Sequence, residues 1–378
     1  TLRDKNFHNL ADLDNVDVIE GRAEFIDNHT LRVFQADGER VLRGEKIFIN
    51  TGAESVIPAI TGLTTTAGVF DSTGLLSLSQ RPARLGILGG GYIGLEFASM
   101  FANFGTKVTI FEAAPQFLPR EDRDIAQAIT RILQEKGVEL ILNANVQAVS
   151  SKEGAVQVET PEGAHLVDAL LVASGRKPAN RRRLAYSCRK PATAGLQLQN
   201  AGVAVNERGG IIVDDYLRTT ADNIWAMGDV TGGLQFTYIS LDDFRIVRDG
   251  LLGDGKRSTR DRQNVPYSVF MTPPLSRVGL TEEQARASGA TVQVVTLPVA
   301  AIPRARVMND TRGVLKAVVD VNTQRIVGVS LLCVDSHEMI NIVKTVMDAD
   351  LPYTVLRDQI FTHPTMSESL NDLFSLIK

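Results

Sequence analysis

The chain has 378 residues, of which 44% are hydrophobic and 22% charged, a balance that excludes a disordered protein. This length predicts two or three domains. The net charge is −4 and no apolar run approaches the roughly 18–20 residues of a membrane-spanning helix, so the sequence predicts neither a nucleic-acid partner nor a membrane partner.

Residues 1–80 predict short strands joined by turns. Asn28 and the Asp37-Gly38 pair are turn residues that accept a positive φ. The runs typical of strands are Val16–Ile19, Thr30–Phe34 and Lys46–Asn50. A β-meander is the simplest interpretation. Since the chain opens at Thr1 without a strand or turn signal, we expect a fragment or a processed chain, and a meander that is the remainder of a larger domain.

Residues 81–178 change to a strand, a glycine turn, a helix and a second strand. Leu85–Leu88 predicts a buried strand, and apolar residues then recur at helical spacing until Gly105. A second helix is predicted at about 121–136. This alternation predicts a Rossmann-like nucleotide-binding domain.

Residues 179–262 are predicted to return to the first domain, starting with an insertion at about 180–192. The tetrapeptide Arg176–Ala179 recurs as Arg189–Ala192, which a short duplication in a surface loop explains. Residues 263–378 predict a C-terminal α+β domain.

The strongest local signal is a G-x-G-x-x-G run between the first strand and the first helix of residues 81–178. Gly89 permits the tight turn, Gly91 lets the backbone approach a pyrophosphate, and Gly94 lets helix and strand pack closely. The phosphates would lie at the positive end of the helix. The residues of this turn that we expect to bind the dinucleotide are Gly89, Gly90, Gly91, Tyr92, Ile93 and Gly94.

An acidic residue, Glu112, ends the next strand at the offset of a ribose-binding carboxylate. Its carboxylate would accept hydrogen bonds from the adenosine ribose and would repel a 2′-phosphate. Ala113 and Ala114 follow, where an NADP site more often has arginine. The sequence therefore predicts NAD as the nucleotide, with NADH preferred over NADPH.

Four short motifs, taken in order along the chain, resemble those of the pyridine nucleotide-disulfide oxidoreductases. Thr51-Gly52-Ala53 resembles the turn that links the FAD and NAD domains, and Ala173-Ser174-Gly175 resembles its second copy. Ala221–Asp229 resembles the strand whose last carboxylate binds the ribityl chain of FAD. Phe361–Glu368 resembles the catalytic His-Glu segment. The resemblance covers nearly the whole chain except the insertion.

The resemblance implies an α/β fold with two Rossmann-like nucleotide-binding domains, the FAD one incomplete, and a C-terminal α+β dimerisation domain. FAD and NAD would be the cofactors, and a homodimer would form through the C-terminal domain. Glu96 would lie beside the nicotinamide. The other cofactor-binding residues that it implies are Thr51, Gly52, Ala53, Gly175, Gly228, Asp229, Gln235, Phe236, Thr237 and Tyr238.

His363 and Glu368 would form the acid–base pair. A carboxylate bonded to one imidazole nitrogen fixes the tautomer and leaves the other nitrogen free for proton transfer to a thiolate. In the family each active site uses both chains, so the resemblance implies that His363 serves the partner subunit.

The predicted function is electron transfer from NADH through FAD to a disulfide, a metal ion such as Cu(II) or a related oxidant, in the cytoplasm. Within the family, Asn223–Leu241 and Ser367–Lys378 resemble the copper-reducing type of the bacterial reactive-chlorine response. The sequence contains neither the FAD glycine motif of the family nor its C-x-x-x-x-C pair, and Cys188 and Cys333 are predicted to be inert. Two alternatives stay open: a flavin NADH oxidase or diaphorase without disulfide chemistry, and an inactive NAD-binding dimeric fragment.

Overall fold

The computed structural model describes residues 2–174 and 189–378. The chain forms two compact units. Unit 1 combines Thr1–Ser55 with Pro178–Asp261, and unit 2 combines Val56–Lys177 with Arg262–Lys378. Within the described ranges, no helix is long and apolar enough to cross a membrane.

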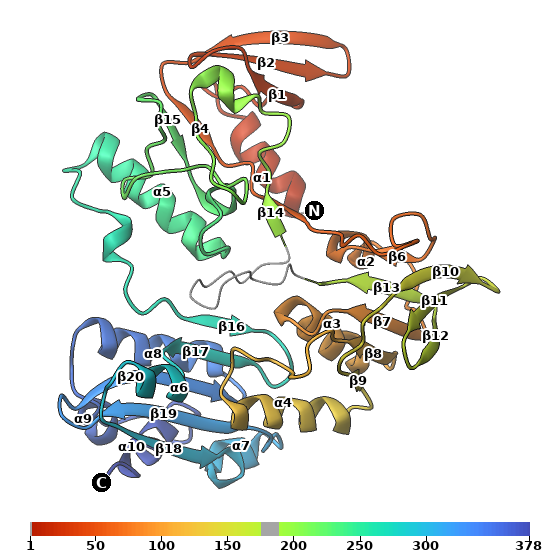
Figure 1. Cartoon of the computed structure of the whole chain (residues 1–378). Helices are drawn as coiled ribbons and strands as arrows, with labels where there is room; N and C mark the ends of the chain where they lie inside the picture. The colour runs from red at the N-terminus through yellow and green to blue at the C-terminus, as the bar shows by residue number, and fades with distance from the viewer. Residues whose placement is uncertain (1, 175–188) are drawn as a thin grey trace. The chain divides into compact units, whose positions relative to one another are not determined.

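The described residues of unit 1 form three small sheets (Figure 1). The antiparallel meander that the sequence predicts is confirmed, because its three strands pair in chain order. The other two sheets join segments distant in sequence, β4 with β15 in parallel and β5 with β14 antiparallel. The strands are β1 (Arg22–Phe25), β2 (Thr30–Gln35), β3 (Gly38–Arg43), β4 (Ile47–Ile49), β5 (Ala53–Ser55), β14 (Arg189–Pro191) and β15 (Ile224–Ala226).

Two details at the start of unit 1 differ from the sequence prediction. Leu2–Ala11 forms helix α1, and the run Val16–Ile19 is not a strand. Helix α1 buries none of its residues, so no apolar periodicity marks it in the sequence. The remaining helical elements of the unit are α5 (Thr237–Leu252) and the 3₁₀ turns η1 (Leu198–Ala201), η2 (Gly228–Thr231) and η3 (Thr259–Asp261).

Residues 56–174 of unit 2 form a nucleotide-binding type of domain. Its five strands are all parallel, in the order β6-β13-β7-β8-β9. The central strands are almost entirely buried, as expected for a parallel sheet covered on both faces. The elements are β6 (Val69–Phe70), α2 (Ser72–Leu76), β7 (Arg84–Leu88), α3 (Tyr92–Asn103), β8 (Lys107–Phe111), α4 (Arg123–Glu135), β9 (Glu139–Ile141) and β13 (Ala169–Val172), with an antiparallel sheet of β10 (Ala148–Lys152), β11 (Ala155–Thr160) and β12 (Gly163–Val167).

The compact units divide the chain after Ser55, whereas the sequence placed residues 1–80 together. The reason is a strand of only two residues, β6, which pairs in parallel with β13 and ties residues 56–80 to the nucleotide-binding sheet. So short a strand gives no periodic signal.

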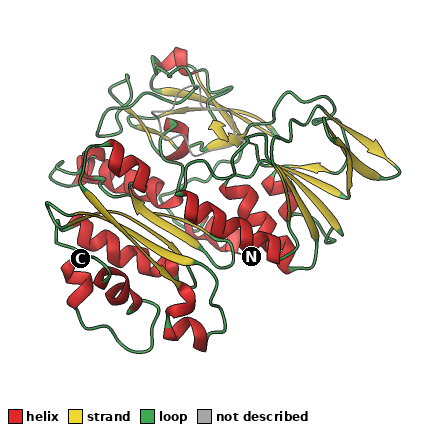
Figure 2. Cartoon of the chain, turned by 60° about the horizontal axis from the view of Figure 1, so that its bottom comes forward, coloured by secondary structure: helices red, strands yellow, loops and turns green. Residues whose placement is uncertain are grey.

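The C-terminal part of unit 2 is a five-stranded antiparallel sheet with helices packed against it, as Figure 2 shows in red and yellow. Helices α8 and α10 pack against this sheet through the buried side chains of Met339, Val343 and Phe374. The strands are β16 (Tyr267–Val269), β17 (Leu275–Gly279), β18 (Val292–Pro298), β19 (Val314–Asp320) and β20 (Arg325–Leu332), and the helical elements are α6 (Glu282–Ala287), η4 (Val299–Ala301), α7 (Pro303–Val307), α8 (Ser336–Asp348), α9 (Thr354–Asp358) and α10 (Ser369–Ser375). The predicted α/β class with a C-terminal α+β domain is confirmed.

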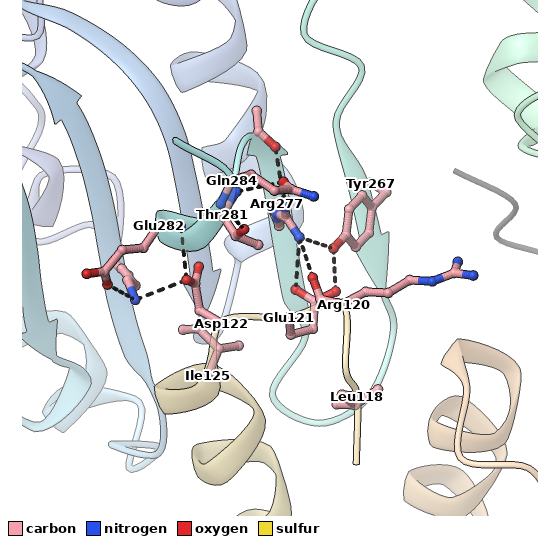
Figure 3. Close-up of polar contacts among 12 residues, drawn as sticks. Leu118, Arg120, Glu121, Asp122, Ile125, Tyr267, Arg277, Thr281, Glu282 and Gln284 are labelled. Carbon is pink, nitrogen blue, oxygen red and sulfur yellow. Dashed lines mark hydrogen bonds and ion pairs between the residues drawn. The ribbon is translucent and has the colours of Figure 1, made fainter. Parts of the chain in front are cut away.

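The two parts of unit 2 meet through a buried ion cluster centred on Lys316 of β19. Its side chain is 5% exposed, and its Nζ lies 3.2 Å from Asp122, 3.1 Å from Asp124 and 2.9 Å from Glu282. Asp122 also accepts a 3.1 Å hydrogen bond from the backbone N–H of Glu282 (Figure 3). Although burial alone would lower the pKa of Lys316, the carboxylates raise it, so the side chain stays charged.

Candidate functional site

The glycine turn before α3 has the geometry that a dinucleotide needs. Gly89 has a φ of +108°, and a Cβ there would lie 2.6 Å from the carbonyl oxygen of Ala173. A Cβ on Gly94 would lie 2.2 Å from the carbonyl oxygen of Gly89, so helix and turn touch directly. A Cβ on Gly91 would meet nothing within 4 Å, and no side chain caps the helix there. This open, uncapped helix N-terminus fits a pyrophosphate.

Glu112 is bound to the same turn. Its Oε2 accepts a 2.8 Å hydrogen bond from the N–H of Gly90, and its Oε1 accepts one of 2.8 Å from the N–H of Ala114. These contacts fix the carboxylate at the end of β8, and each oxygen keeps a second lone pair for a ribose hydroxyl. The structure therefore places the carboxylate of Glu112 beside the glycine turn, and its binding of a ribose stays a prediction.

Tyr92 and Glu96 lie one turn apart at the start of α3. The hydroxyl of Tyr92 donates to Glu121 at 2.6 Å and lies 3.2 Å from the hydroxyl of Tyr267, so its side chain points toward the C-terminal domain and only its backbone remains at the glycine turn. Ile93 follows it, partly buried. Glu96 accepts a 2.8 Å hydrogen bond from the N–H of Phe270. Burial raises the pKa of Glu96 and this N–H opposes the rise.

The residues predicted to bind the FAD ribityl chain lie in unit 1. Gly228 has a φ of +72°, and its N–H donates to the buried carboxylate of Asp243 at 2.6 Å. Asp229 follows within η2, and burial raises its pKa. The guanidinium of Arg189 lies 3.9 Å from this carboxylate and opposes the rise. The carboxylate of Asp229 is thus placed where its oxygens could accept a hydrogen bond from a sugar hydroxyl.

The start of α5 carries the residues predicted to line the flavin. The Oε1 atom of Gln235 is buried and has no hydrogen-bond partner among the described residues. The rings of Phe236 and Tyr238 stack with centroids 5.0 Å apart, and no side chain caps the helix that begins at Thr237. An orphaned buried acceptor, an uncapped helix N-terminus and a nearby carboxylate fit FAD, which offers ring N–H groups and sugar hydroxyls.

The predicted linker turn pairs with the second copy of the repeated tetrapeptide. Thr51 donates from its hydroxyl to the carbonyl of Ala192 at 2.8 Å, Gly52 has a φ of +76°, and Ala53 lies opposite Pro191 in the β5–β14 pair. These contacts are within the chain itself and fix the linker. Gly175 and Cys188, and most of the predicted insertion, lie outside the described residues.

The predicted acid–base pair forms. Nδ1 of His363 lies 2.8 Å from Oε2 of Glu368, and the backbone N–H of Thr365 donates to the other carboxylate oxygen at 3.2 Å. Glu368 is the N-cap of α10 rather than a residue of its first turn. The side chain of His363 is 70% exposed and that of Glu368 only 17% exposed, so the carboxylate is fixed and the imidazole faces outward.

The sequence did not reveal three residues that border these sites, namely Arg189, Glu121 and Tyr267. Each lies far along the chain from the other residues of its site. Local patterns therefore marked neither Glu121 nor Tyr267, and only the repeated tetrapeptide drew attention to Arg189.

Cys333 is fully buried, and burial raises the pKa of its thiol to about 12, which agrees with an inert structural role. In the part of the chain that the structure describes, no three His, Cys, Asp or Glu side chains are grouped to hold a metal ion.

A glycine turn on a parallel sheet, a second segment that fits a flavin and a His-Glu pair on an antiparallel domain define an α/β nucleotide-dependent oxidoreductase. The family model described as pyridine nucleotide-disulphide oxidoreductase matches residues 2–243. The model of the dimerisation domain of that family matches residues 265–374. The chain belongs to the pyridine nucleotide-disulfide oxidoreductase family. The family and the enzyme class predicted from the sequence are therefore confirmed.

Several relatives cover almost all of the chain. The probable pyridine nucleotide-disulfide oxidoreductase RclA of Escherichia coli (strain K12) is 72% identical over 377 residues, 100% of this chain and 82% of the relative. The mercuric reductase of Bacillus cereus is 33% identical over 98% of this chain and 56% of its own length. The dihydrolipoyl dehydrogenase of Geobacillus stearothermophilus is 32% identical over 93% of this chain and 72% of its own length. The family uses FAD together with NAD(P)H.

Two solved structures are similar to the whole chain. The HOCl-induced flavoprotein disulfide reductase RclA from Escherichia coli superimposes with a TM-score of 0.94 at 71% identity and covers 100% of this chain and 83% of that chain. The Cu(II) complex of the same flavoprotein gives a TM-score of 0.95 at 71% identity, with 100% and 82% covered.

Proposed function

We propose that this chain carries the NADH-binding, FAD-binding and proton-transfer elements of an enzyme that passes electrons from NADH through FAD to a disulfide or to a metal ion such as Cu(II). The observation that carries the proposal is the uncapped glycine turn before α3, to which the carboxylate of Glu112 is bound. Family membership supports the flavin and the reductase chemistry.

The preference for NADH over NADPH rests on charge. The carboxylate of Glu112 lies at the strand end where an adenosine ribose is expected, and it would repel a 2′-phosphate placed there. Ala113 and Ala114 offer no cation that would offset this repulsion. We therefore expect the unphosphorylated nucleotide to bind more tightly.

Replacing Glu112 with alanine should weaken NADH binding by about 1–3 kcal/mol, because hydrogen bonds to a charged acceptor are lost. The same change should narrow the gap in affinity between NADH and NADPH. Titration of the purified chain with both nucleotides measures the two dissociation constants. Glu139→Ala is the control, since this carboxylate lies on the neighbouring strand β9 and bonds only to Thr109 within the described residues. Equal affinity of the unmutated chain for NADH and NADPH would contradict the assignment.

The flavin supplies the chemistry of taking a hydride from nicotinamide and delivering electrons singly or in pairs. The residues of this chain would bind and orient it. Asp229 would accept a hydrogen bond from a ribityl hydroxyl, Gln235 would accept one from a ring N–H, and the N-terminus of α5 would stabilise negative charge.

His363 would exchange a proton with a thiol at its Nε2, because Nδ1 is engaged by Glu368. The dimerisation-domain match over residues 265–374 supports a homodimer, and the 70% exposure of His363 is consistent with service to the active site of the partner subunit. We propose a cytoplasmic location, because the sequence has only two cysteines and their spacing is not that of a disulfide framework.

Direct reduction of a metal ion from the flavin is a second candidate. This reaction needs no exposed thiol, and the thiol of Cys333 is fully buried. The solved Cu(II) complex of the Escherichia coli flavoprotein supports copper as the ion. The deciding experiment compares NADH oxidation with a low-molecular-weight disulfide and with Cu(II) as acceptors, after addition of FAD. Oxidation with neither acceptor would contradict both candidates.

A further inference from the structure

An extended segment of the C-terminal domain runs along one face of α3, the helix that begins at the glycine turn. We call residues 267–272 the β16 segment. The helix residues that it contacts are spaced by four, three and four positions, which places them on one face of the helix. The contacts are Tyr267 Oη with Tyr92 Oη at 3.2 Å, Phe270 N–H to Glu96 at 2.8 Å, Thr272 N–H to Ser99 at 2.9 Å and Asn103 to Thr272 Oγ1 at 3.3 Å.

The carboxylate of Glu121 joins the β16 segment to the start of α3 and to the loop that follows Glu112. Oε1 of Glu121 accepts hydrogen bonds from the hydroxyls of Tyr92 and Tyr267, each at 2.6 Å. Glu121 ends the loop that begins at Glu112, and its side chain is 0% exposed. Burial, together with the neighbouring carboxylate, raises the pKa of both phenols, so both stay protonated and donate.

Arg277 of β17 holds Glu121 from the side of the C-terminal domain (Figure 3). Its guanidinium lies 3.6 Å from Oε2 of Glu121 and donates to the carbonyl of Arg120 at 3.1 Å and to Gln284 at 3.1 Å. Because this guanidinium is 7% exposed, water screens the contact with Glu121 little. The helix start, the loop after Glu112 and the C-terminal domain are therefore joined at one buried point.

We propose that Tyr267 is a positioning residue for the nicotinamide nucleotide. Together with Glu121 and the backbone N–H groups of Phe270 and Thr272, it holds α3 so that the glycine turn meets the pyrophosphate and Glu96 meets the nicotinamide. The proposal rests on the NADH site of the proposed function. It assigns to the C-terminal domain a part in nucleotide binding, besides dimerisation.

Tyr267→Phe tests the proposal because it keeps the ring, which stacks on Tyr92 with centroids 5.3 Å apart, and removes only the hydroxyl. We expect the dissociation constant for NADH to rise about tenfold. Hydrogen exchange of the backbone amides in the first turn of α3 should become faster, since the turn loses a fixed neighbour. The affinity for adenosine, which has no phosphate and needs only the Glu112 side of the site, should be nearly unchanged.

Ser268→Ala is the matched control. Ser268 is the next residue of β16, and its hydroxyl forms a 2.7 Å hydrogen bond with Ser276, away from α3. This variant should lose thermal stability to a similar extent and bind NADH as the unmutated chain does. Glu121→Gln keeps an acceptor oxygen for the two phenols and should weaken NADH in the same direction, so it carries the test if Tyr267→Phe does not fold.

An unchanged NADH affinity in both test variants would overturn the proposal. Equal losses for NADH and adenosine would also overturn it, because they would indicate general loosening of the domain. An unmutated chain that binds no NADH would be a different failure, since it would overturn the proposed function itself.

Discussion

Replacing His363 with alanine should lower NADH-dependent disulfide turnover by about 10²–10⁴-fold, the usual contribution of a positioned proton-transfer group. Reduction of the bound flavin by NADH should stay nearly unchanged, because hydride transfer requires no imidazole. The hydrogen bond of 2.8 Å between Glu368 and Nδ1 fixes the tautomer that leaves Nε2 to exchange the proton. Stopped-flow flavin reduction and steady-state disulfide turnover, measured on the full gene product, check the two halves of this expectation.

Glu368→Gln should do less harm than His363→Ala, since it removes the charge but keeps a side chain that can bond to the imidazole. Reduction of Cu(II) directly from the flavin should be nearly indifferent to both changes, and it serves as the internal control. Disulfide turnover at the unmutated rate in His363→Ala would mean that the pair only packs the end of the chain. The diaphorase alternative would then be favoured.

Replacing Lys316 with methionine should destabilise unit 2 by about 3 kcal/mol, because removal of one partner from a buried ion cluster leaves uncompensated charge. We expect the lower end of the usual range, since the side chains of Asp124 and Glu282 are 43% and 32% exposed and water can reach them. Urea unfolding measures the change in the free energy of unfolding.

Lys344→Met is the matched control for Lys316→Met. Lys344 forms an ion pair one helical turn away with Asp348 on α8, and both side chains are about one third exposed. An exposed pair of this kind contributes less than about 1 kcal/mol. If the two lysine variants lost equal stability, the cluster around Lys316 would not be acting as a buried one.

The same cluster gives a pH dependence with a defined sign. Hydrogen bonding to Lys316 holds the pKa of Glu282 below its usual value in the folded chain. Its stabilising contribution is therefore complete above the unfolded pKa and is lost as the pH falls through the folded pKa. The raised pKa of Lys316 acts in the opposite direction, and its contribution is lost as the pH rises through that value.

Local patterns were enough to predict the glycine turn and the position of Glu112, because both are specified by a few neighbouring residues at fixed spacing. The His363–Glu368 pair was predicted from the resemblance to the family, and the roles of all these residues stay predictions. The hydrogen bond between Gly90 and Glu112 crosses 22 positions but follows from the strand–turn–helix unit itself. The apolar repeat between residues 121 and 136 likewise predicted α4, whose isoleucines form a buried stripe.

The contacts between the two parts of unit 2 could not be predicted in this way. Tyr267 and Glu121 are 146 positions apart, and Lys316 and Asp124 are 192 apart. A single tyrosine, lysine or glutamate in a sequence is usually a solvated side chain. Only the packing of two domains shows that these side chains are buried together.

The pairing of β5 with β14 has a consequence for how this chain can be shortened. The strand opposite Ala53–Ser55 is made by the second Arg-Lys-Pro-Ala, and an identical tetrapeptide stands upstream at residues 176–179. Excision of residues 176–188 would therefore leave the same four residues in front of Thr193, joined directly to Gly175. Such a deletion would remove 13 residues and leave the sequence of β14 unchanged. The same junction is a place where another peptide could be inserted without changing the sequence of β5 or β14.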